Sequence, residues 1–312
     1  MAPKLSIVIP LYEEEGNVPE LMKRIEEALA SYSYEVIAVD DGSRDKTFAK
    51  LKEIAKHDTK LHVIRFAMNA GQTAALAAGI EQAKGEIIVT MDGDLENDPK
   101  DIPALLAKLD EGYDIVSGWR QGRWADAALT RKLPSRLANS LIAAVTKVPL
   151  HDFGCTLKAY RREAITGIDL YGHMHRFIPA YIAAQGGKVA EMPVSFTPRT
   201  YGTSKYGISR TFKVLMDLLV VVFFTKFLAR PMHFFGGLGI MSCFLGSLAA
   251  FIALLLKLFN IKHLVETPLP LIAGFLFIIG LQLVIFGVLS ELISRIYYES
   301  RGKKPYRIKE TV

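Results

Sequence analysis

The chain has 312 residues, half of them hydrophobic, and 38 basic against 32 acidic side chains give a formal net charge of +6. This length allows one sizeable globular domain with additional elements. The mild basic excess suits phosphates or a lipid surface, but the sequence has no dense lysine and arginine tract of the kind that binds nucleic acid. Its two cysteines, Cys155 and Cys243, show no metal-ligand spacing, so a reduced, cytosol-facing domain is expected.

Residues 1–120 alternate short, β-branched apolar runs with helix-like stretches. Strands are expected over Leu5–Ile9, Val36–Val39, Leu61–Phe66, Ile87–Met91 and Ile115–Ser117. Helices are expected over Val18–Ala30, Thr47–Ala55, Thr73–Ala83 and Ile102–Leu109, the first capped by Asn17. This alternation predicts an α/β fold with a mostly parallel sheet covered on both faces. Residues 121–200 are more polar, and we expect them to be largely irregular.

The last third of the chain is strongly apolar. Phe212–Leu228 carries Lys213, Asp217 and Lys226, so we interpret it as a helix on a membrane surface rather than a span. Two uncharged segments follow, at about 232–256 and 269–290, and each reaches the roughly 20 residues needed to cross a bilayer. The alternative is a pair of buried core helices. A short connector makes the two segments a hairpin with both ends on one side.

The distribution of basic residues predicts which side that is. Five lysines and arginines precede the first span within residues 205–230, and six follow the second within 295–309, whereas the connector has only Lys257 and Lys262. The positive-inside rule therefore places both termini and the α/β domain in the cytoplasm. We expect four regions: a domain over 1–208, a juxtamembrane amphipathic helix over 209–230, two transmembrane helices within 231–294, and a basic tail over 295–312.

Acidic, aromatic and basic side chains follow successive expected strands. The sequences at these strand ends are Pro10-Leu11-Tyr12-Glu13-Glu14, Asp40-Asp41-Gly42, Asp92-Gly93-Asp94 and Ser117-Gly118-Trp119-Arg120. Taken alone, each has a plain structural explanation, such as an Asp-Gly turn or a helix cap. Because ligands of parallel sheets bind at the carboxyl ends of the strands, the four together indicate one site.

These residues resemble the nucleotide-sugar-binding signature of family-2 glycosyltransferases with the GT-A fold. More narrowly, the chain is similar to polyprenyl-phosphate glycosyltransferases, a group that includes dolichyl-phosphate mannose synthase and the GtrB and ArnC types. The resemblance covers essentially the whole chain, including the C-terminal hairpin and the segment Asp152–Arg162. It implies a GT-A, Rossmann-like domain that carries a metal-dependent glycosyltransferase activity.

The resemblance implies that Asp92 and Asp94 hold Mg²⁺ or Mn²⁺ against the leaving diphosphate. Hard oxygen ligands suit both ions, and a divalent cation stabilises the charge that develops on the leaving group. Asp94 is expected as the direct ligand, with Asp92 contacting the ribose or the metal. Where the family usually has Gln, this chain has Glu96, and the resemblance assigns that position no role.

The donor site is expected to use residues from the first three strand ends as well. They are Pro10, Tyr12, Glu14, Asp40, Asp41, Asn69 and Gln72. For the segment 69–72, which includes Gly71, a turn that caps the next helix is the open alternative. Arg199 and Lys205 match a family loop that closes over the diphosphate, and the alternative there is a plain juxtamembrane basic loop.

The acceptor side needs positive charge rather than a strong base, because a phosphomonoester is mostly a dianion at neutral pH and is already nucleophilic. Arginine forks suit phosphate oxygens. Arg120 is the first candidate, and Arg131 and Arg136 are further acceptor-phosphate candidates. For Arg136, and for Arg123 earlier in the same region, the alternative is a solvated side chain that faces anionic lipid.

We therefore expect an inverting transfer from a nucleotide sugar to polyprenyl phosphate, undecaprenyl phosphate in a bacterium, at the inner (plasma) membrane. A UDP-sugar is favoured over GDP-mannose. ArnC-like enzymes use a UDP-linked aminosugar and GtrB-like enzymes use UDP-glucose, so the sugar stays open. Relatives suggest a homo-oligomer, such as a tetramer, and no nucleic-acid partner is expected.

Two rival functions are less consistent with the sequence. A processive polysaccharide synthase carries a Gln-x-x-Arg-Trp element, and neither Trp119 nor Trp124 lies in one. A catalytically silent scaffold that merely binds nucleotide sugar would not need Asp92, Asp94 and Arg120 together.

Overall fold

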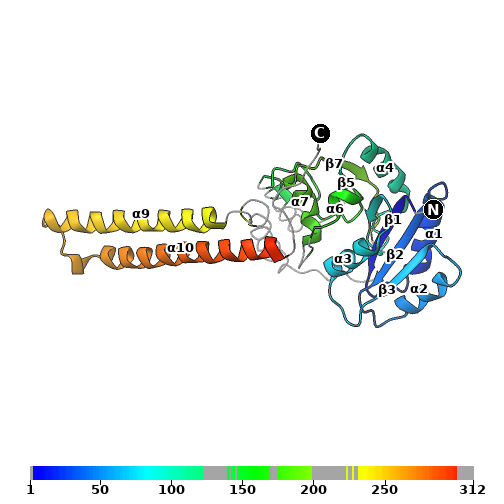
Figure 1. Cartoon of the computed structure of the whole chain (residues 1–312), viewed down its shortest axis with the longest axis horizontal. Coiled ribbons are helices and arrows are strands. Elements are labelled where there is room, and N and C mark those ends of the chain that lie inside the picture. Colours follow the sequence, from blue (N-terminus) through cyan, green and yellow to red (C-terminus); the bar gives the residue numbers. More distant parts are fainter. Residues whose placement is uncertain are drawn as a thin grey trace. The chain divides into compact units, whose positions relative to one another are not determined.

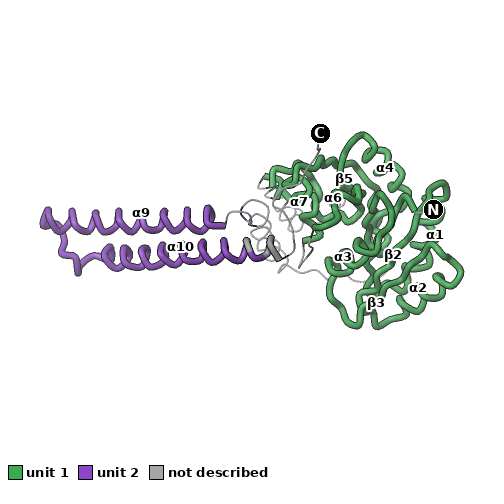
Figure 2. The backbone as a smooth tube through the Cα atoms, in the orientation of Figure 1, with its two compact units in different colours: residues 1–221 green, residues 222–312 purple. Residues whose placement is uncertain are grey.

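The computed structural model forms two compact units, 1–221 and 222–312 (Figure 2). It describes residues 3–121, 139–140, 142–144, 146–168, 170, 174–198, 223, 227 and 231–300, with the side chains of 295 and 297–300 excepted. The expected surface helix over 209–230 lies outside these residues apart from Phe223 and Phe227, and so does the tail from 301 onward. Each unit is considered by itself.

The first unit is built on a seven-stranded sheet (Figure 1). Its strands are β1 (Leu5–Leu11), β2 (Tyr34–Asp40), β3 (Leu61–Arg65), β4 (Ile87–Thr90), β5 (Ile115–Arg120), β6 (Lys158–Arg161) and β7 (Val189–Val194). They lie in the order β3-β2-β1-β4-β6-β5-β7. Among the described strands, β6 alone runs antiparallel, to both of its neighbours β4 and β5. The mostly parallel sheet and the five strands expected in residues 1–120 are thus confirmed.

The described helices of this unit connect and cover the strands. They are α1 (Val18–Ala28), α2 (Thr47–Ala55), η1 (Pro99–Asp101) leading into α4 (Ile102–Asp110), α3 (Gln72–Gln82), α6 (Arg162–Ile165), η2 (Met174–Phe177) and α7 (Ile178–Ala184). Asn17 occupies the N-cap position of α1, as expected, but its side chain makes no capping hydrogen bond to the helix. Its amide instead donates to the Glu14 Oε2 atom at 2.6 Å, because the preceding loop folds back over the helix start.

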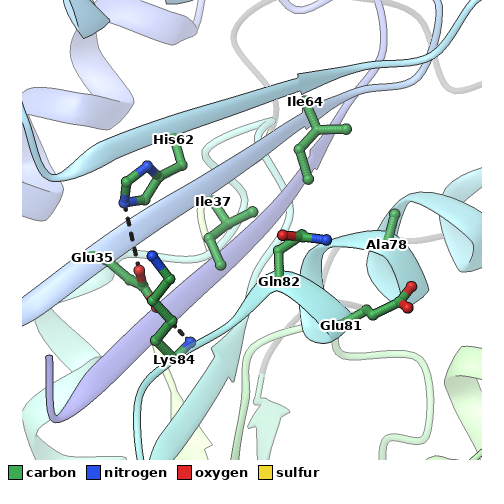
Figure 3. Close-up of a pocket in the computed structure, with 8 residues that line it drawn as sticks. All are labelled: Glu35, Ile37, His62, Ile64, Ala78, Glu81, Gln82 and Lys84. Atoms are coloured by element: carbon green, nitrogen blue, oxygen red, sulfur yellow. Dashed lines mark hydrogen bonds and ion pairs between the residues drawn. The ribbon is translucent and has the colours of Figure 1, made fainter. Parts of the chain in front are cut away.

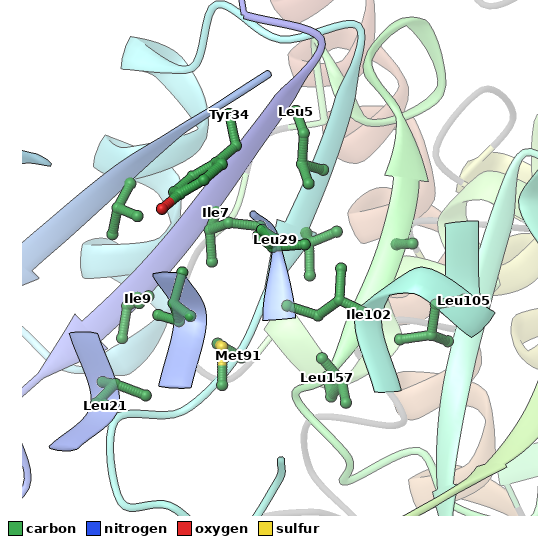
Figure 4. Packing of buried hydrophobic residues seen from close by; sticks show 14 of the residues in the cluster. Leu5, Ile7, Ile9, Leu21, Leu29, Tyr34, Met91, Ile102, Leu105 and Leu157 are labelled. Carbon is green, nitrogen blue, oxygen red and sulfur yellow. The ribbon is translucent and has the colours of Figure 1, made fainter. Parts of the chain in front are cut away.

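The core has two layers because successive side chains of a strand point to opposite faces. On one face, Leu5, Ile7 and Ile9 of β1 pack with apolar residues of α1 and α4, among them Leu21 and Leu105 (Figure 4). On the other face, a second cluster joins the sheet to α3, α6 and α7. Two-sided coverage explains why β1 and β2 are buried along almost their whole length.

The expectation that residues 121–200 are largely irregular is wrong, because β6 and β7 complete the sheet there. The sequence of β6, Lys-Ala-Tyr-Arg, has no apolar run, because all of its residues except Ala159 are basic or aromatic. Its strand conformation is imposed by pairing with β4 on one side and β5 on the other. Local composition therefore cannot reveal it.

The second unit contains two long apolar helices, α9 (Pro231–Leu258) and α10 (Leu269–Ser300), joined through η4 (Leu264–Glu266). They pack closely where Gly239 faces Gly280, since a Cβ atom on Gly239 would lie 2.8 Å from the Gly280 carbonyl oxygen. The Ser242 hydroxyl donates to the Leu276 carbonyl across the same contact at 2.7 Å. Both helices are long and apolar enough to cross a membrane, at the positions expected from the sequence.

Candidate active site

The carboxyl ends of the parallel strands gather the side chains singled out by the sequence. Because β6 is antiparallel, its amino end lies at the same edge, with Lys158 opposite both Thr90 of β4 and Ser117 of β5. The turn 152–157, which precedes β6, therefore joins the loops that follow β4 and β5. Because β6 is inserted between β4 and β5, residues of this one turn contact both Asp92 and Arg120.

The loop after β1 is fixed to the start of α2. Pro10 lies near the end of β1, and the backbone N–H groups of Glu13 and Glu14 donate to the hydroxyls of Ser43 and Thr47, at 3.0 and 2.9 Å. Tyr12 and Glu14 thus lie on a loop whose backbone is held in place, as a binding loop requires.

The paired aspartates after β2 have different partners. Asp40 is fully buried, accepts from the Ser43 N–H at 3.1 Å and has Arg65 Nε 3.3 Å from its Oδ2 atom. Both carboxylate oxygens of Asp41 accept hydrogen bonds from the loop after β3, from Ala70 N at 2.7 Å and Gly71 N at 2.9 Å. Asp40 therefore holds the turn after β2 in place, and its support of a nucleotide pocket stays a prediction.

Asn69 and Asp41 form one unit, since the Asn69 amide donates to Asp41 Oδ2 at 3.0 Å. The two loops meet at Gly42, which has a φ of +72°. A Cβ atom there would lie 2.6 Å from the Met68 carbonyl carbon, so only glycine fits. The turn-and-cap alternative for residues 69–72 describes these contacts, and any contact of Asn69 with nucleotide stays a prediction.

Asp92 is held by two hydrogen bonds from different segments. The Gln72 amide, at the first residue of α3, donates to Oδ1 at 2.6 Å, and the Thr156 hydroxyl donates to Oδ2. Asp92 is thereby fixed between helix α3 and the turn 152–157. Gln72, predicted to contact the donor, thus has a described role in orienting Asp92.

The neighbouring Asp94 is almost fully buried and accepts from the Glu96 N–H at 3.0 Å through Oδ1. Between them, Leu95 adopts a φ of +60°, a left-handed conformation that is unusual for leucine. This bend turns the chain sharply between Asp94 and Glu96. Departures of this kind concentrate at functional sites, because the surrounding structure must hold them.

Arg120 is the centre of a buried ionic network. Its Nε and Nη2 atoms donate to the two oxygens of Asp152 at 2.8 and 3.1 Å, and its Nη1 atom lies 3.6 Å from Glu96 Oε2. Burial disfavours the guanidinium charge, but the Asp152 carboxylate outweighs it, and the pKa of Arg120 is raised. The structure therefore gives Glu96 an ionic partner, where the resemblance gave it no role.

Three residues of this network were missed by the sequence reasoning. Asp152 holds Arg120, Thr156 holds Asp92, and Glu191 of β7 accepts from the backbone N–H groups of His151 and Asp152 at 2.9 and 3.0 Å. An aspartate two residues before a glycine signals a turn at 152–154. The pairing of Asp152 with Arg120, 32 residues earlier, has no local signal.

The other predicted basic residues, Arg123, Arg131, Arg136, Arg199 and Lys205, lie outside the described residues. Among the residues that the structure does describe, no group of three or more His, Cys, Asp or Glu side chains is arranged to hold a metal ion. Asp92 and Asp94 nevertheless fit a divalent cation that also binds diphosphate oxygens. They are hard oxygen donors two residues apart in the sequence, and the hydrogen bonds described for Asp92 orient its carboxylate.

A pocket in the same unit lies elsewhere. It is lined by Glu35 and His62 at the amino ends of β2 and β3, by Lys84 before β4, and by the C-terminal part of α3, which includes Glu81 (Figure 3). Glu35 accepts there from the Ser6 hydroxyl and the Lys84 N–H at 2.6 and 2.7 Å. This is the edge of the sheet opposite to Asp92, so these contacts stabilise the domain rather than extend the candidate site.

The sheet order and the charged carboxyl edge define an α/β domain of the GT-A class. Glucosyl-3-phosphoglycerate synthase from Mycobacterium tuberculosis, solved with Mn²⁺, UDP and phosphoglyceric acid, has a similar fold, with a TM-score of 0.56 and 19% sequence identity. The match covers 72% of this chain and 78% of that one. At this identity the likeness shows the fold alone.

The chain belongs to glycosyl transferase family 2, whose model matches residues 6–168. It is 42% identical to the dodecaprenyl-phosphate galacturonate synthase of Rhizobium johnstonii, over 98% of this chain and 92% of that one. It is 37% identical to the undecaprenyl-phosphate 4-deoxy-4-formamido-L-arabinose transferase of Shewanella sediminis, again over 98% and 92%. These relatives confirm the resemblance to polyprenyl-phosphate glycosyltransferases, and the protein is a family-2 glycosyltransferase.

Proposed function

We propose that the protein transfers a sugar from a UDP-sugar to polyprenyl phosphate, with inversion at the anomeric carbon, to give a polyprenyl-phosphate sugar. The observation that carries this proposal is the linkage of Asp92 and Arg120 through one turn, which holds a donor-side carboxylate and a cation at fixed positions. Direct displacement of a leaving group needs this kind of alignment of two substrates.

On the donor side, Asp94 and Asp92 would hold Mg²⁺ or Mn²⁺, which supplies positive charge to the departing diphosphate. Gln72 and Thr156 fix the Asp92 carboxylate, so its orientation is set before substrate binds. The loop of Tyr12 and Glu14 would contact the nucleoside, with the wall formed by Asp41 and Asn69 behind it.

Pro10 and Asp40 would complete the nucleotide site next to Asp41 and Asn69. Arg199 and Lys205 would lie over the diphosphate. A basic lid would neutralise phosphate charge and exclude water, which suppresses hydrolysis of the donor.

On the acceptor side, the lipid phosphate is itself the nucleophile, so the protein has to neutralise and align it rather than deprotonate it. Arg120 supplies a fixed positive charge at the carboxyl edge of β5. Because Asp152 and Glu96 already engage three of its nitrogens, its proposed role is to set the potential around the phosphate. Arg131 and Arg136 would then make the direct contacts.

We propose that α9 and α10 span the inner membrane as a hairpin, with both termini and the GT-A domain on the cytoplasmic side. This topology rests on the basic residues that flank the two spans and on the sparsely charged connector. It would keep the site at the depth of the lipid headgroups, where the acceptor phosphate lies. A homo-oligomer, such as a tetramer associated through the C-terminal helices, is part of this proposal.

For the sugar, the names of the relatives favour a uronic acid or a formamido-pentose. The experiment is transfer in detergent by the full chain, with Mn²⁺ or Mg²⁺, undecaprenyl phosphate and a panel of labelled UDP- and GDP-sugars that includes UDP-galacturonic acid. Label that enters the lipid fraction from one UDP-sugar is the expected result. Label only from GDP-mannose would overturn the UDP assignment, and donor binding without any transfer would favour the silent scaffold.

A further inference from the structure

Lys158 is a buried charge to which the proposed reaction assigns no part. It is the first residue of β6, is 2% exposed, and lies between Thr90 of β4 and Ser117 of β5. A lysine is almost never fully buried without a partner, since the charged form loses its hydration. Burial accordingly lowers the pKa of the Lys158 ammonium, while the carboxylates of Asp152 and Asp92 act in the opposite direction.

The described contact of this ammonium is with the turn 152–157. Its Nζ atom donates to the Cys155 carbonyl, three residues earlier, so the side chain folds back and closes the turn. An ammonium has three donors. Among the described residues one carbonyl accepts from it, and the carboxylates of Asp152 and Asp92 favour its charged form against the effect of burial.

The turn closed by Lys158 holds both halves of the candidate site. At the start of the turn, Asp152 accepts hydrogen bonds from Arg120, and near its end, the Thr156 hydroxyl donates to Asp92. The Thr90 hydroxyl provides a neutral tie to the same turn, donating to the Thr156 carbonyl at 2.6 Å. Movement of the turn would therefore shift Asp92 and Arg120 relative to each other.

The local charges give Lys158 a second consequence. Around the turn, the described residues include five carboxylates, from Asp92, Asp94, Glu96, Asp152 and Glu191, and two cations, from Arg120 and Lys158. With all seven ionised, the sum is three negative charges, so the group attracts a divalent cation. Removal of either cation would make the group more negative and its attraction for a divalent cation stronger.

We propose that Lys158 is a positioning residue, whose buried ammonium aligns Asp92 with Arg120 through the turn 152–157 and limits how tightly the nearby carboxylates hold a divalent cation. The inference rests on the proposed function for its link to transfer. Its effect on cation binding is separate and can be measured without turnover.

The test compares Lys158→Gln, which keeps a donor for the Cys155 carbonyl but has no charge, with Lys158→Arg, which keeps the charge. Thr90→Val is the matched control, because it removes the neutral tie to the same turn and leaves every charge in place. For each full-length variant in detergent, electron paramagnetic resonance of free Mn²⁺ gives the Mn²⁺ Kd, and label transfer gives kcat and the donor KM.

We expect Lys158→Gln to bind Mn²⁺ at least threefold more tightly than the wild type and to lose at least tenfold in kcat. Lys158→Arg should keep the wild-type Mn²⁺ Kd within twofold, and Thr90→Val should not tighten it. Weaker or unchanged Mn²⁺ binding in Lys158→Gln would overturn the proposal, as would equal tightening in Thr90→Val. Should Lys158→Gln fail to fold, Lys158→Met with the same readouts replaces it.

The proposed function can fail without the inference. If the wild type transfers no sugar but Lys158→Gln still tightens Mn²⁺ binding, the transfer proposal fails and the charge effect of Lys158 stands. If the wild type transfers sugar and Lys158→Gln leaves both kcat and the Mn²⁺ Kd unchanged, Lys158 has no positioning role.

Discussion

Arg120 and Asp152 form a bidentate ion pair whose side chains are 2% and 13% exposed, with nitrogen–oxygen distances of 2.8 and 3.1 Å. The pair joins the end of β5 to the turn before β6, two segments that come together only in the folded sheet. A buried pair of this kind need not stabilise the fold more than apolar residues would, but the removal of one partner leaves an uncompensated charge. That asymmetry makes the pair easy to test.

Asp152→Asn should destabilise the protein by about 3–5 kcal/mol, because the Arg120 guanidinium stays buried without its carboxylate. Urea unfolding of the full chain in detergent, followed by tryptophan fluorescence, measures this change. The control is Glu111→Gln, which breaks the exposed pair of Glu111 with Lys108 and should cost under about 1 kcal/mol. Similar losses in the two variants would contradict the buried-pair interpretation.

Arg120→Gln removes the fixed positive charge that is proposed to act on the acceptor phosphate, while its amide can still donate to Asp152. If Arg120 serves the acceptor side, the KM for polyprenyl phosphate should rise by roughly tenfold or more, equivalent to about 1.4 kcal/mol, while donor affinity changes little. Steady-state kinetics with each substrate varied in turn, together with calorimetry of donor binding, separate the two effects. Equal losses on both sides would move Arg120 to the donor site.

Asp94→Asn should reduce metal-dependent transfer by roughly 10²–10³-fold, the range seen when one electrostatic group of an active site is removed. The amide is isosteric and can still accept from the Glu96 N–H, so the fold should persist. Transfer is measured against Mn²⁺ concentration, with circular dichroism as the check on folding. Wild-type activity in this variant would eliminate the metal assignment.

Four of the first five strands, β1, β2, β4 and β5, were predictable because their apolar runs reflect burial on both faces of the sheet, whereas the edge strand β3 was marked by its β-branched residues alone. The gathering of Asp41, Asp92 and Arg120 followed from strand-end geometry alone. β6 was not predictable, since its strand conformation depends on pairing with β4 and β5, and Arg161 donates to the carbonyls of Leu109 and Tyr113, which lie about 50 residues earlier. Asp152 was missed for the same reason, because its role exists only once β6 has been inserted between β4 and β5.

The contact between the loops after β2 and β3, behind the proposed nucleotide site, leads to a separate prediction about Gly42. Gly42→Ala should destabilise the protein by about 2–4 kcal/mol, since an L-residue at φ +72° is strained and its Cβ would also meet the Met68 backbone at 2.6 Å. Gly112→Ala is the matched control, with a φ of +97° and no atom within 4 Å of an added Cβ, and it should cost about 1–2 kcal/mol. Thermal unfolding of both variants gives two losses of stability, and their difference is the steric cost at Gly42. Equal losses would mean that Gly42 and the Met68 backbone are not in close contact.

Gln72 offers the most direct test of how Asp92 is oriented. Gln72→Leu keeps the size of the side chain but removes the 2.6 Å hydrogen bond to Asp92 Oδ1, worth roughly 1.5–3 kcal/mol for a charged acceptor. We expect kcat to fall about tenfold, because Asp92 would be held by Thr156 alone among its described partners. Gln82→Leu, at the other end of the same helix and on the opposite edge of the sheet, should leave kcat unchanged. If the two variants behave alike in transfer assays, the helix tolerates the change at either end and Gln72 does not orient Asp92.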